Sequence, residues 1–412
     1  MIKYLPAYKY RTIFLTCFII VGLVTSKAVM SIGVISMFAN LLIEFDYKNT
    51  LKNFISNKIL FSLSFLFFAS IIALTYSNNP SNGFHFVLNK FPLLVIPLAF
   101  SRMDKMNKNN FLFILNFFIG LLFLTMILVF YRYFSNLETV NNSLKEGKAI
   151  WVPFNHIRFN LMLVFAFVSS VYLYFQNQFF KINFKIKYIY AFLTIFFFIS
   201  IHILSVRSAL IVLYLNILVA LYLYIIKTKN YQVLVFSLFA IITIPLLTYQ
   251  NVESFRNKVN YMKYDWEQMS SSDVGSNNDS RRIISYKLGW QLVKNSFPLG
   301  LGTGGIQHEM NLLFAENHPE IVERDRIMPH NQFLYILIDY GLLGLIALCI
   351  TLFYPFLKLK NKRNNIYYIS FAIITIVPLL FDISLEMQLG ITFFALFSSL
   401  ILKQISIENA NA

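Results

Sequence analysis

Long apolar runs recur along most of this 412-residue chain, and they limit what it can fold into. About 20 apolar residues span the core of a bilayer as one helix. Irregular backbone cannot face lipid, because its polar groups would stay unpaired. We therefore predict an all-α polytopic membrane protein with about 12 transmembrane helices. The predicted spans are 11–25, 29–45, 59–76, 84–100, 111–134, 157–176, 188–204, 208–226, 231–249, 331–357, 366–383 and 387–404.

Composition supports a chain with little soluble bulk. Hydrophobic residues make up 57% of it and charged residues 13%, whereas soluble proteins average about 25% charged residues. Cys17 and Cys349 both fall in predicted spans, so they predict no disulfide framework and indicate no compartment. The first apolar run lacks a small-residue cleavage site, and a second run follows at once, so we interpret it as the first helix rather than a signal peptide.

The net charge of +16 could indicate a nucleic-acid partner, but its distribution indicates topology instead. Basic residues gather at one end of the predicted spans, in segments 48–58, 102–108, 181–187 and 358–363. The short turns 77–83 and 382–386 at the other end carry none. Positive charge favours the cytoplasmic side. We therefore predict cytoplasmic N- and C-termini and no nucleic-acid partner.

The spans divide the chain into three parts. Residues 1–249 hold predicted transmembrane helices one to nine, residues 250–330 form a large periplasmic loop, and residues 331–412 hold the last three helices and a cytoplasmic C-terminus. A shorter polar loop, 135–156, lies on the same outer side. Loops of such length in a compact protein are usually functional or disordered. We expect short helices in the large loop, since apolar residues between 283 and 293 have near-helical spacing.

A glycine-rich run at 300–305 follows that helical pattern. It could cradle a phosphate, but it lacks the Lys-Ser/Thr of a P-loop and no strand precedes it. We interpret it as a tight turn in which glycine provides positive φ.

Arginines at the outer ends of the predicted helices are candidate anion ligands. Arg207 lies in a very short outer turn, and Arg158 lies at the start of a span. Each could extend toward lipid phosphate or act as a fixed functional cation. Arg281 and Arg282 open the loop helix, where they are either surface charge or an anion site with added backbone donors.

His330-Asn331 follows a proline at the mouth of the tenth predicted span. A histidine there can cap a helix or anchor the span, and it is also the side chain best suited to move a proton near neutral pH. His308 and His318 could suggest a zinc site, but their spacing fits no standard ligand pattern. We predict no metal site.

Four stretches together resemble one family. They are the Ser/Arg turn at 203–212, the Arg-led helix with its Pro and Gly segment at 281–305, the His-Asn motif and following helix at 330–346, and the Leu-Glu-Met-Gln-Leu-Gly segment with its Phe-rich run at 385–397. In these stretches and their order, the chain resembles the O-antigen ligase and O-antigen polymerase superfamily of bacterial membrane glycosyltransferases. The resemblance covers roughly residues 200 to 405, and the earlier helices agree in topology.

The resemblance implies an enzyme of the bacterial inner (plasma) membrane with its active site on the periplasmic face. The donor would be a glycan on polyprenyl (undecaprenyl) diphosphate, and the acceptor a hydroxyl of lipid A-core or of another glycan. Transfer would need no nucleotide sugar, no cofactor and no metal. We expect an O-antigen ligase of lipopolysaccharide biosynthesis, with membrane lipid around it.

The resemblance also assigns roles. His330 matches the family's histidine and would deprotonate the acceptor. Arg207 matches the arginine of the Ser/Arg turn, and Arg282 best matches the loop arginine, with Arg281 as the alternative. These arginines would bind the diphosphate, because guanidinium groups suit bidentate contacts with phosphate. Arg158, Asn331 and Glu386 are further candidate substrate contacts. Of these, Glu386 could also orient a catalytic group, judged by its outer position alone.

Other functions stay open at this point. A repeat-unit polymerase joins one glycan unit to another, and related enzymes glycosylate protein; the acceptor pocket decides between them. A polysaccharide transporter or flippase would carry polar residues near the midplane of several helices, whereas these spans are mostly Phe, Leu and Ile. A non-catalytic scaffold of envelope assembly is a third class, which His330 and the nearby arginines disfavour.

Overall fold

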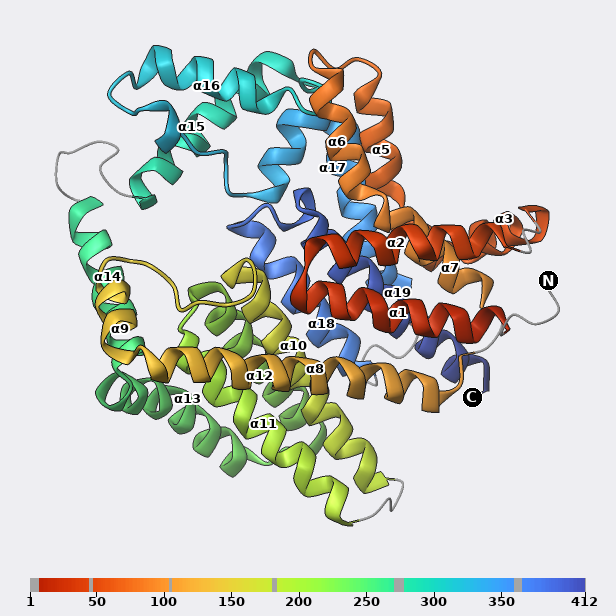
Figure 1. The fold of residues 1–412 in the computed structure, drawn as a ribbon, viewed down its shortest axis with the longest axis vertical. Coiled ribbons are helices and arrows are strands. Elements are labelled where there is room, and N and C mark those ends of the chain that lie inside the picture. The colour runs from red at the N-terminus through yellow and green to blue at the C-terminus, as the bar shows by residue number, and fades with distance from the viewer. Residues whose placement is uncertain are drawn as a thin grey trace.

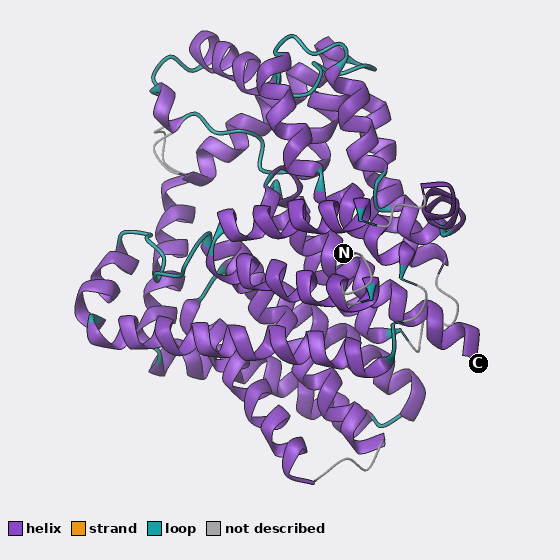
Figure 2. Cartoon of the chain, turned by 45° about the vertical axis from the view of Figure 1, so that its right-hand side comes forward, coloured by secondary structure: helices purple, strands orange, loops and turns teal. Residues whose placement is uncertain are grey.

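The fold is helical. A computed structural model describes residues 7–43, 47–103, 106–179, 184–269, 278–358 and 365–411. Within these ranges the regular structure consists of helices without strands, as Figure 2 shows. The predicted all-α class is confirmed. A helix pairs its own backbone groups, so it is the form that apolar runs take in a bilayer.

The helices are labelled in chain order in Figure 1. Asparagines begin several of them: the side chains of Asn79, Asn107 and Asn230 each accept a hydrogen bond from the amide three residues on, which satisfies an otherwise unpaired donor. The bounds are α1 Tyr8–Thr25, α2 Lys27–Leu42, α3 Tyr47–Ser56, α4 Lys58–Ser62, α5 Phe65–Leu74, α6 Pro80–Lys90, α7 Pro92–Arg102, α8 Lys108–Ser135, α9 Leu137–Lys145, α10 His156–Phe179, α11 Phe184–Leu204, α12 Arg207–Thr228, α13 Tyr231–Asn251, α14 Glu253–Met269, α15 Asn278–Ser296, α16 Ile306–Asn317, η2 Glu323–Asp325, α17 Gln332–Lys358, α18 Ile366–Ile376, η4 Val377–Leu380, η5 Ser384–Glu386 and α19 Gln388–Asn411.

The described helices make this an integral membrane protein. Nine described helical stretches are long and apolar enough to cross a membrane, with α6 and α7 counted together as Pro80–Arg102. The count is ten if α2 and α3, bent by 117°, form one broken span. Two further apolar stretches, Lys58–Leu74 and Ile366–Leu380, are shorter. Each of the twelve predicted segments coincides with one of these helical stretches. Twelve crossings stay a prediction, because α2 and the two shorter stretches fall below the usual length on their own.

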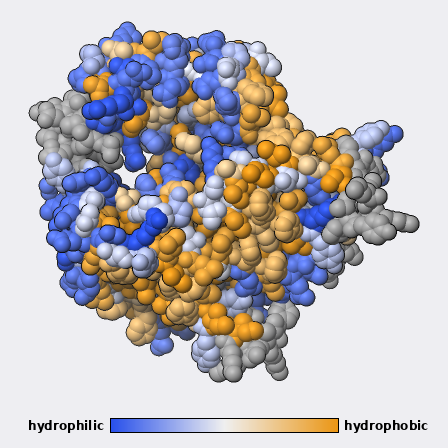
Figure 3. All heavy atoms as spheres, in the orientation of Figure 1, coloured by the Kyte–Doolittle hydropathy of each residue, from blue (hydrophilic) through white to orange (hydrophobic). Residues whose placement is uncertain are grey.

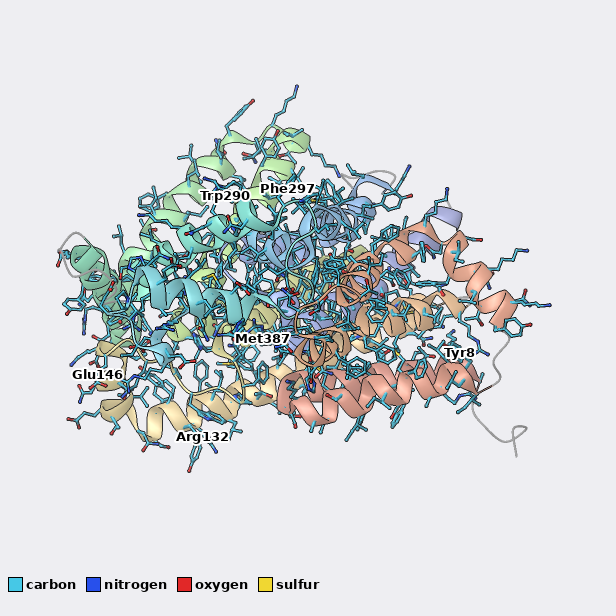
Figure 4. All side chains as sticks on the ribbon, turned by 90° about the horizontal axis from the view of Figure 1, so that it is seen from above. Tyr8, Arg132, Glu146, Trp290, Phe297 and Met387 are labelled. Atoms are coloured by element: carbon cyan, nitrogen blue, oxygen red, sulfur yellow. The ribbon has the colours of Figure 1, made fainter. Side chains whose placement is uncertain are left out.

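The start of α1 and the end of α19 lie on one side of the molecule, and α9 and α14 lie on the opposite side (Figure 1). Seen from above in Figure 4, Tyr8 at the start of α1 and Glu146 just after α9 are again at opposite ends. Which side faces the cytoplasm stays a prediction from the distribution of basic residues.

An aromatic core joins the first and last parts of the chain. The ring of Phe165 on α10 lies 5.5 Å from that of Phe118 on α8, 5.0 Å from that of Phe371 on α18 and 4.7 Å from that of Phe397 on α19. Edge-to-face and tilted pairs at such distances add to the dispersion energy of a packed interior. This packing sets the ends of α10 and α18 beside each other, where the candidate site lies.

A second, smaller core lies outside the main bundle. Buried apolar residues of α15 and α16 pack against the start of α17: Ile284, Leu288, Met310, Phe314 and Tyr335. The helix predicted from the apolar spacing at 283–293 is confirmed as part of α15. The predicted large loop therefore contains helices, α14 to α16, of which α15 and α16 share this core with α17.

The glycine-rich run is a turn that docks onto α17. Gly300, Gly302 and Gly304 have φ of 80°, 81° and 90°, which confirms the predicted use of glycine for positive φ. The amide of Gly302 donates to the Asp339 carbonyl at 2.8 Å. α17 is broken at Gly341, where φ is 64°. The break leaves backbone groups of α17 available for hydrogen bonds with this turn. The turn is thus a structural joint between the outer core and the bundle.

Candidate active site

His330 lies directly before α17 and is held by three elements. The side chain of Asn331 accepts a hydrogen bond from the Leu334 amide at 3.0 Å, which caps α17. Asn331 Nδ2 also donates to the Leu380 carbonyl at the end of η4, at 3.1 Å. The Tyr286 hydroxyl on α15 donates to the His330 carbonyl at 3.0 Å. Asn331, predicted as a substrate contact, thus fixes the backbone beside the histidine.

Asp382 is the carboxylate that pairs with His330. His330 Nδ1 lies 3.9 Å from Asp382 Oδ1, with 31% of the histidine side chain exposed. This separation exceeds that of a hydrogen bond, and the two groups form an ion pair only when the imidazole is protonated. On its other side, Asp382 Oδ2 lies 3.2 Å from Arg158 Nη2 and accepts from Ser384 Oγ at 2.6 Å. The carboxylate is therefore fixed by Arg158 and Ser384 while its other oxygen faces the imidazole.

The surroundings of Asp382 favour its charged form. Burial raises the pKa of this carboxyl, but His330, Arg158 and Ser384 outweigh burial and hold the pKa below its ordinary value. The group is then ionised at neutral pH. An ionised carboxylate beside Nδ1 favours the tautomer with its proton on Nδ1 and stabilises the imidazolium ion. Nε2 is left as the nitrogen that can accept a proton.

Arg158, a predicted substrate contact, is buried at the first turn of α10. Its Nη2 binds Asp382, while its Nε has no hydrogen-bond partner within the described part of the chain. Arg158 lines a cavity of about 30 Å³ together with Ser384 and Gly390. Most of the other lining is apolar, including Leu161, Leu389 and Phe393. The structure thus joins Arg158 to the histidine through Asp382.

The two loop arginines differ in direction. Arg281 Nη2 forms an ion pair with Asp325 Oδ2 at 3.2 Å. Arg282 lies one helical turn before Tyr286, and residues four apart share a helix face. That face meets the histidine segment, because Tyr286 binds the His330 carbonyl. Arg282 therefore lies on the helix face that meets the histidine segment, and which of the two arginines binds the diphosphate stays a prediction.

Arg207 begins α12 at the same end of the bundle. The second half of α12, from Asn216 on, lines a cavity with Ile366 and Ser370 at the start of α18. α12 also contacts η4, which follows α18. The two helices are therefore antiparallel, and the first turn of α12 lies toward η4. The turn before Arg207 is tied to α14, since Ser254 Oγ donates to the Ile203 carbonyl at 2.8 Å.

Glu386, predicted as an orienting group, is buried in an ion pair with Lys90 of α6. Gln332 Nε2 donates to Glu386 Oε1 at 2.8 Å, and Gln332 Oε1 accepts from the Leu385 amide at 2.9 Å. These bonds fasten η5 to α6 and α17. Glu386 therefore fixes the backbone just after Asp382, and the carboxylate that faces His330 is Asp382 itself.

Sequence reasoning missed Asp382. It stands between an apolar helix and a short turn, and no linear spacing relates it to Arg158 or His330. One signal was available: an acidic residue at the edge of apolar spans is a functional candidate by default.

Hydrophilic and hydrophobic residues occupy different parts of the molecular surface. In Figure 3, hydrophilic residues gather over α15 and α16 and along the α9 and α14 side, and the surface is hollowed between these regions. Hydrophobic residues cover the face formed by α1, α2 and α8.

The structure defines a class: an integral membrane protein with a histidine–carboxylate–arginine cluster where several of its helices end. Residues 192–349 match the family model described as O-antigen ligase. Over these residues the chain is similar to that family, which confirms the predicted resemblance and implies an enzyme of the glycosyltransferase type. The matched range includes Arg207, Arg282 and His330, whereas Arg158 and Asp382 join the site by geometry. No protein of curated function matches the chain.

Proposed function

We propose that this protein transfers a glycan from a polyprenyl diphosphate to the hydroxyl group of an acceptor. The observation that carries the proposal is the contact of His330 with Asp382, itself paired with Arg158, in a chain that resembles O-antigen ligases. A fixed carboxylate behind a half-exposed imidazole is the arrangement of a general base.

The first half of the reaction is proton removal. The acceptor hydroxyl binds near His330 Nε2 and gives its proton to that nitrogen as its oxygen attacks the anomeric carbon of the donor sugar. Asp382 stabilises the imidazolium that forms, because its charge faces Nδ1. Arg158 keeps Asp382 in place. A positioned base of this kind accelerates a reaction by about 10²–10⁴-fold.

The second half is departure of the polyprenyl diphosphate. The bond between the anomeric carbon and the diphosphate oxygen breaks, and both bonding electrons leave with that oxygen. Arg207 and Arg282 are the cations proposed to bind this diphosphate. Each hydrogen bond to a charged group contributes about 1.5–3 kcal/mol. The two arginines belong to different elements, α12 and α15, so the diphosphate would lie between the bundle and the outer core.

At the finer level, we propose an O-antigen ligase that joins O-antigen from undecaprenyl diphosphate to lipid A-core. The site would face the periplasm and the two termini the cytoplasm, because the basic residues gather at the end of the spans away from the site. In this proposal, side chains and backbone groups of this chain carry out the glycan transfer without a metal or cofactor.

A deletion in the native host tests this proposal, with the surface glycolipid resolved on a gel. Loss of the long glycan ladder, with lipid-linked polymer accumulating, supports the ligase. Loss of the ladder with retention of core plus a single repeat would identify a polymerase instead. Unchanged surface glycans together with unchanged protein glycosylation would contradict a glycosyltransferase and favour a transporter.

A further inference from the structure

A groove of about 240 Å³ lies between α9 and α14, on the side of the molecule away from the termini. Its lining is Lys145, Asn257, Asn260, Tyr261 and Tyr264. All five side chains carry a polar group. The two tyrosine rings have their centroids 6.5 Å apart and are inclined by 40°.

The groove is built on a fixed frame. Asn257 Nδ2 donates to the Asn141 carbonyl of α9 at 3.2 Å, and Asn141 Nδ2 donates to a Glu253 carboxylate oxygen at 2.8 Å. Gly147 has φ 84°, and a Cβ there would lie 2.5 Å from the Tyr261 ring. The ring therefore rests on a backbone position that only glycine allows. Gly147 thus supports one face of the Tyr261 ring without a bound ligand.

The lining chemistry suits a saccharide. Tyrosine offers a flat apolar ring with a hydroxyl at its end, and asparagine offers adaptable donors and acceptors. A sugar presents the complement: a C–H face that packs on a ring and an edge of hydroxyl groups. A lipid chain would need an apolar lining, and a strongly anionic ligand would need more than the single Lys145. Tyr264, 56% exposed, leaves ring surface open for such packing.

The groove is connected to the candidate active site along α14. Lys258 of this helix binds the Gly147 carbonyl at 2.9 Å and lies within electrostatic range of His156. His156 in turn lies within range of Arg158 and Asp382. Tyr264 lies six residues beyond Lys258, which is about 9 Å along a helix. A ligand in the groove would thus lie farther along α14 than Lys258, displaced from the reaction centre.

We propose that the α9–α14 groove is a saccharide subsite that holds sugars of the glycan remote from the reacting bond. This deepens the proposed function and rests on it, since it identifies the glycan itself as a ligand in addition to the diphosphate. The subsite contributes affinity to long glycans and little to a donor that carries a single short unit.

Binding without turnover tests the subsite. Oligosaccharides released by mild acid from the host's own surface glycan, and separated by length, are titrated into the purified full-length protein. Binding is followed by saturation-transfer NMR. Tyr264→Ala removes the exposed ring, and we expect affinity for the longer fractions to fall about 5- to 10-fold, in line with the contribution of one aromatic contact. Tyr264→Phe and Tyr264→Trp should keep most of the affinity because they keep a ring.

Tyr231→Ala is the matched control, because Tyr231 is an exposed tyrosine at the far end of α13 from α14. Equal affinity of Tyr264→Ala and Tyr231→Ala for the longer oligosaccharides would overturn the subsite, as would absence of binding to the wild-type protein. This failure is distinct from failure of the proposed function, which is judged by glycan transfer in the host. Normal transfer without oligosaccharide binding would remove the subsite alone.

Discussion

His330 is partly exposed and meets a carboxylate through one nitrogen. Its Nδ1 faces the buried Asp382 carboxylate, and the residue lies just ahead of α17. This matters chemically, because a base must be held on one side and accessible on the other. Arg158 completes the arrangement by neutralising the second oxygen of Asp382.

Replacing Asp382 by Asn should change how stability depends on pH. The pKa of Asp382 is below its ordinary value in the folded protein, so this group stabilises the fold above its unfolded pKa of about 3.9. That contribution is lost as the pH falls through the lower folded value. We expect Asp382→Asn to be less stable than wild type at neutral pH, with the gap closing in acid.

Thermal unfolding of the detergent-solubilised protein, from neutral pH downward, measures this difference. Glu316→Gln is the control, since Glu316 is an exposed carboxylate on α16. A constant gap between Asp382→Asn and wild type at every pH would show that the Asp382 charge does not contribute in this way.

The two loop arginines should separate on mutation. Arg282 shares a helix face with Tyr286, which contacts the His330 segment, whereas Arg281 pairs with Asp325. We expect Arg282→Ala to lower glycan transfer by about 10-fold or more, since one lost charge-assisted bond costs about 1.5–3 kcal/mol. Arg282→Lys should restore little, because lysine cannot make the bidentate contact.

Arg281→Ala serves as the matched neighbour, and transfer in host membranes at equal protein level is the measurement. An equal or larger loss for Arg281→Ala would contradict the assignment of the diphosphate contact to Arg282.

The sequence offered candidate site residues but did not predict the contacts that join them. His330 and Arg158 were candidates from their positions at span ends, and the structure joins them through Asp382. The joining residue was missed because the contact depends on how α10, α18 and α17 end relative to one another. That relation is set by packing of side chains such as Phe165 and Phe371, which carry no linear signal of their own.

Among the elements, the short segment η5 is the one that needs the most support. It follows Asp382 and is fastened by the buried pair of Lys90 and Glu386 and by two hydrogen bonds of Gln332. Because these groups lie away from water, each depends on its partner. The pair connects α6, near the start of the chain, to the segment that carries the site.

Breaking that pair should cost more than removing it. Lys90→Met leaves the Glu386 carboxylate buried and unpaired, and we expect a loss of about 3–5 kcal/mol in the free energy of unfolding. The double variant Lys90→Met/Glu386→Leu removes both charges and should be closer to wild type. Unfolding of the purified protein measures both variants. A double variant less stable than Lys90→Met would mean that each group is held by other partners.

The glycine turn shows what sequence can predict about an element. Alternation of Gly with other residues after a proline predicted positive φ, and Gly300, Gly302 and Gly304 have it. The docking of this turn at a break in α17 could not be predicted, because the helical pattern of that span continues through Gly341. The break combines the positive φ that Gly341 allows with hydrogen bonds between the turn and α17.

The whole molecule has a polar side and an apolar body. α9, α14 and the outer core gather on one side, away from the start of α1 and the end of α19 (Figure 1). The apolar runs predicted this class of fold because every span must pair its own backbone. They did not fix the number of crossings, since the stretches Lys58–Leu74 and Ile366–Leu380 are apolar but shorter than a usual span.

Orientation can be tested directly. We expect reporters fused after the C-terminus and before the N-terminus to be cytoplasmic, because basic residues favour that side. A cysteine introduced at Lys145, at the end of α9, should react with a membrane-impermeant maleimide in intact cells, whereas one introduced at Lys58 should not. Labelling at Lys58 without labelling at Lys145 would reverse the orientation and place the site on the wrong face for an outer acceptor.

The most direct test of the central claim is transfer of glycan in membranes from a deletion strain, which supply their own lipid-linked donor and acceptor, after addition of the purified protein. We predict that the wild-type protein forms product in the presence of EDTA. His330→Ala should slow this by about 10²–10⁴-fold, while His308→Ala, at an exposed histidine of α16, should match wild type. Product formation by His330→Ala at the wild-type rate and equal protein level would contradict a histidine base and with it the account of this site.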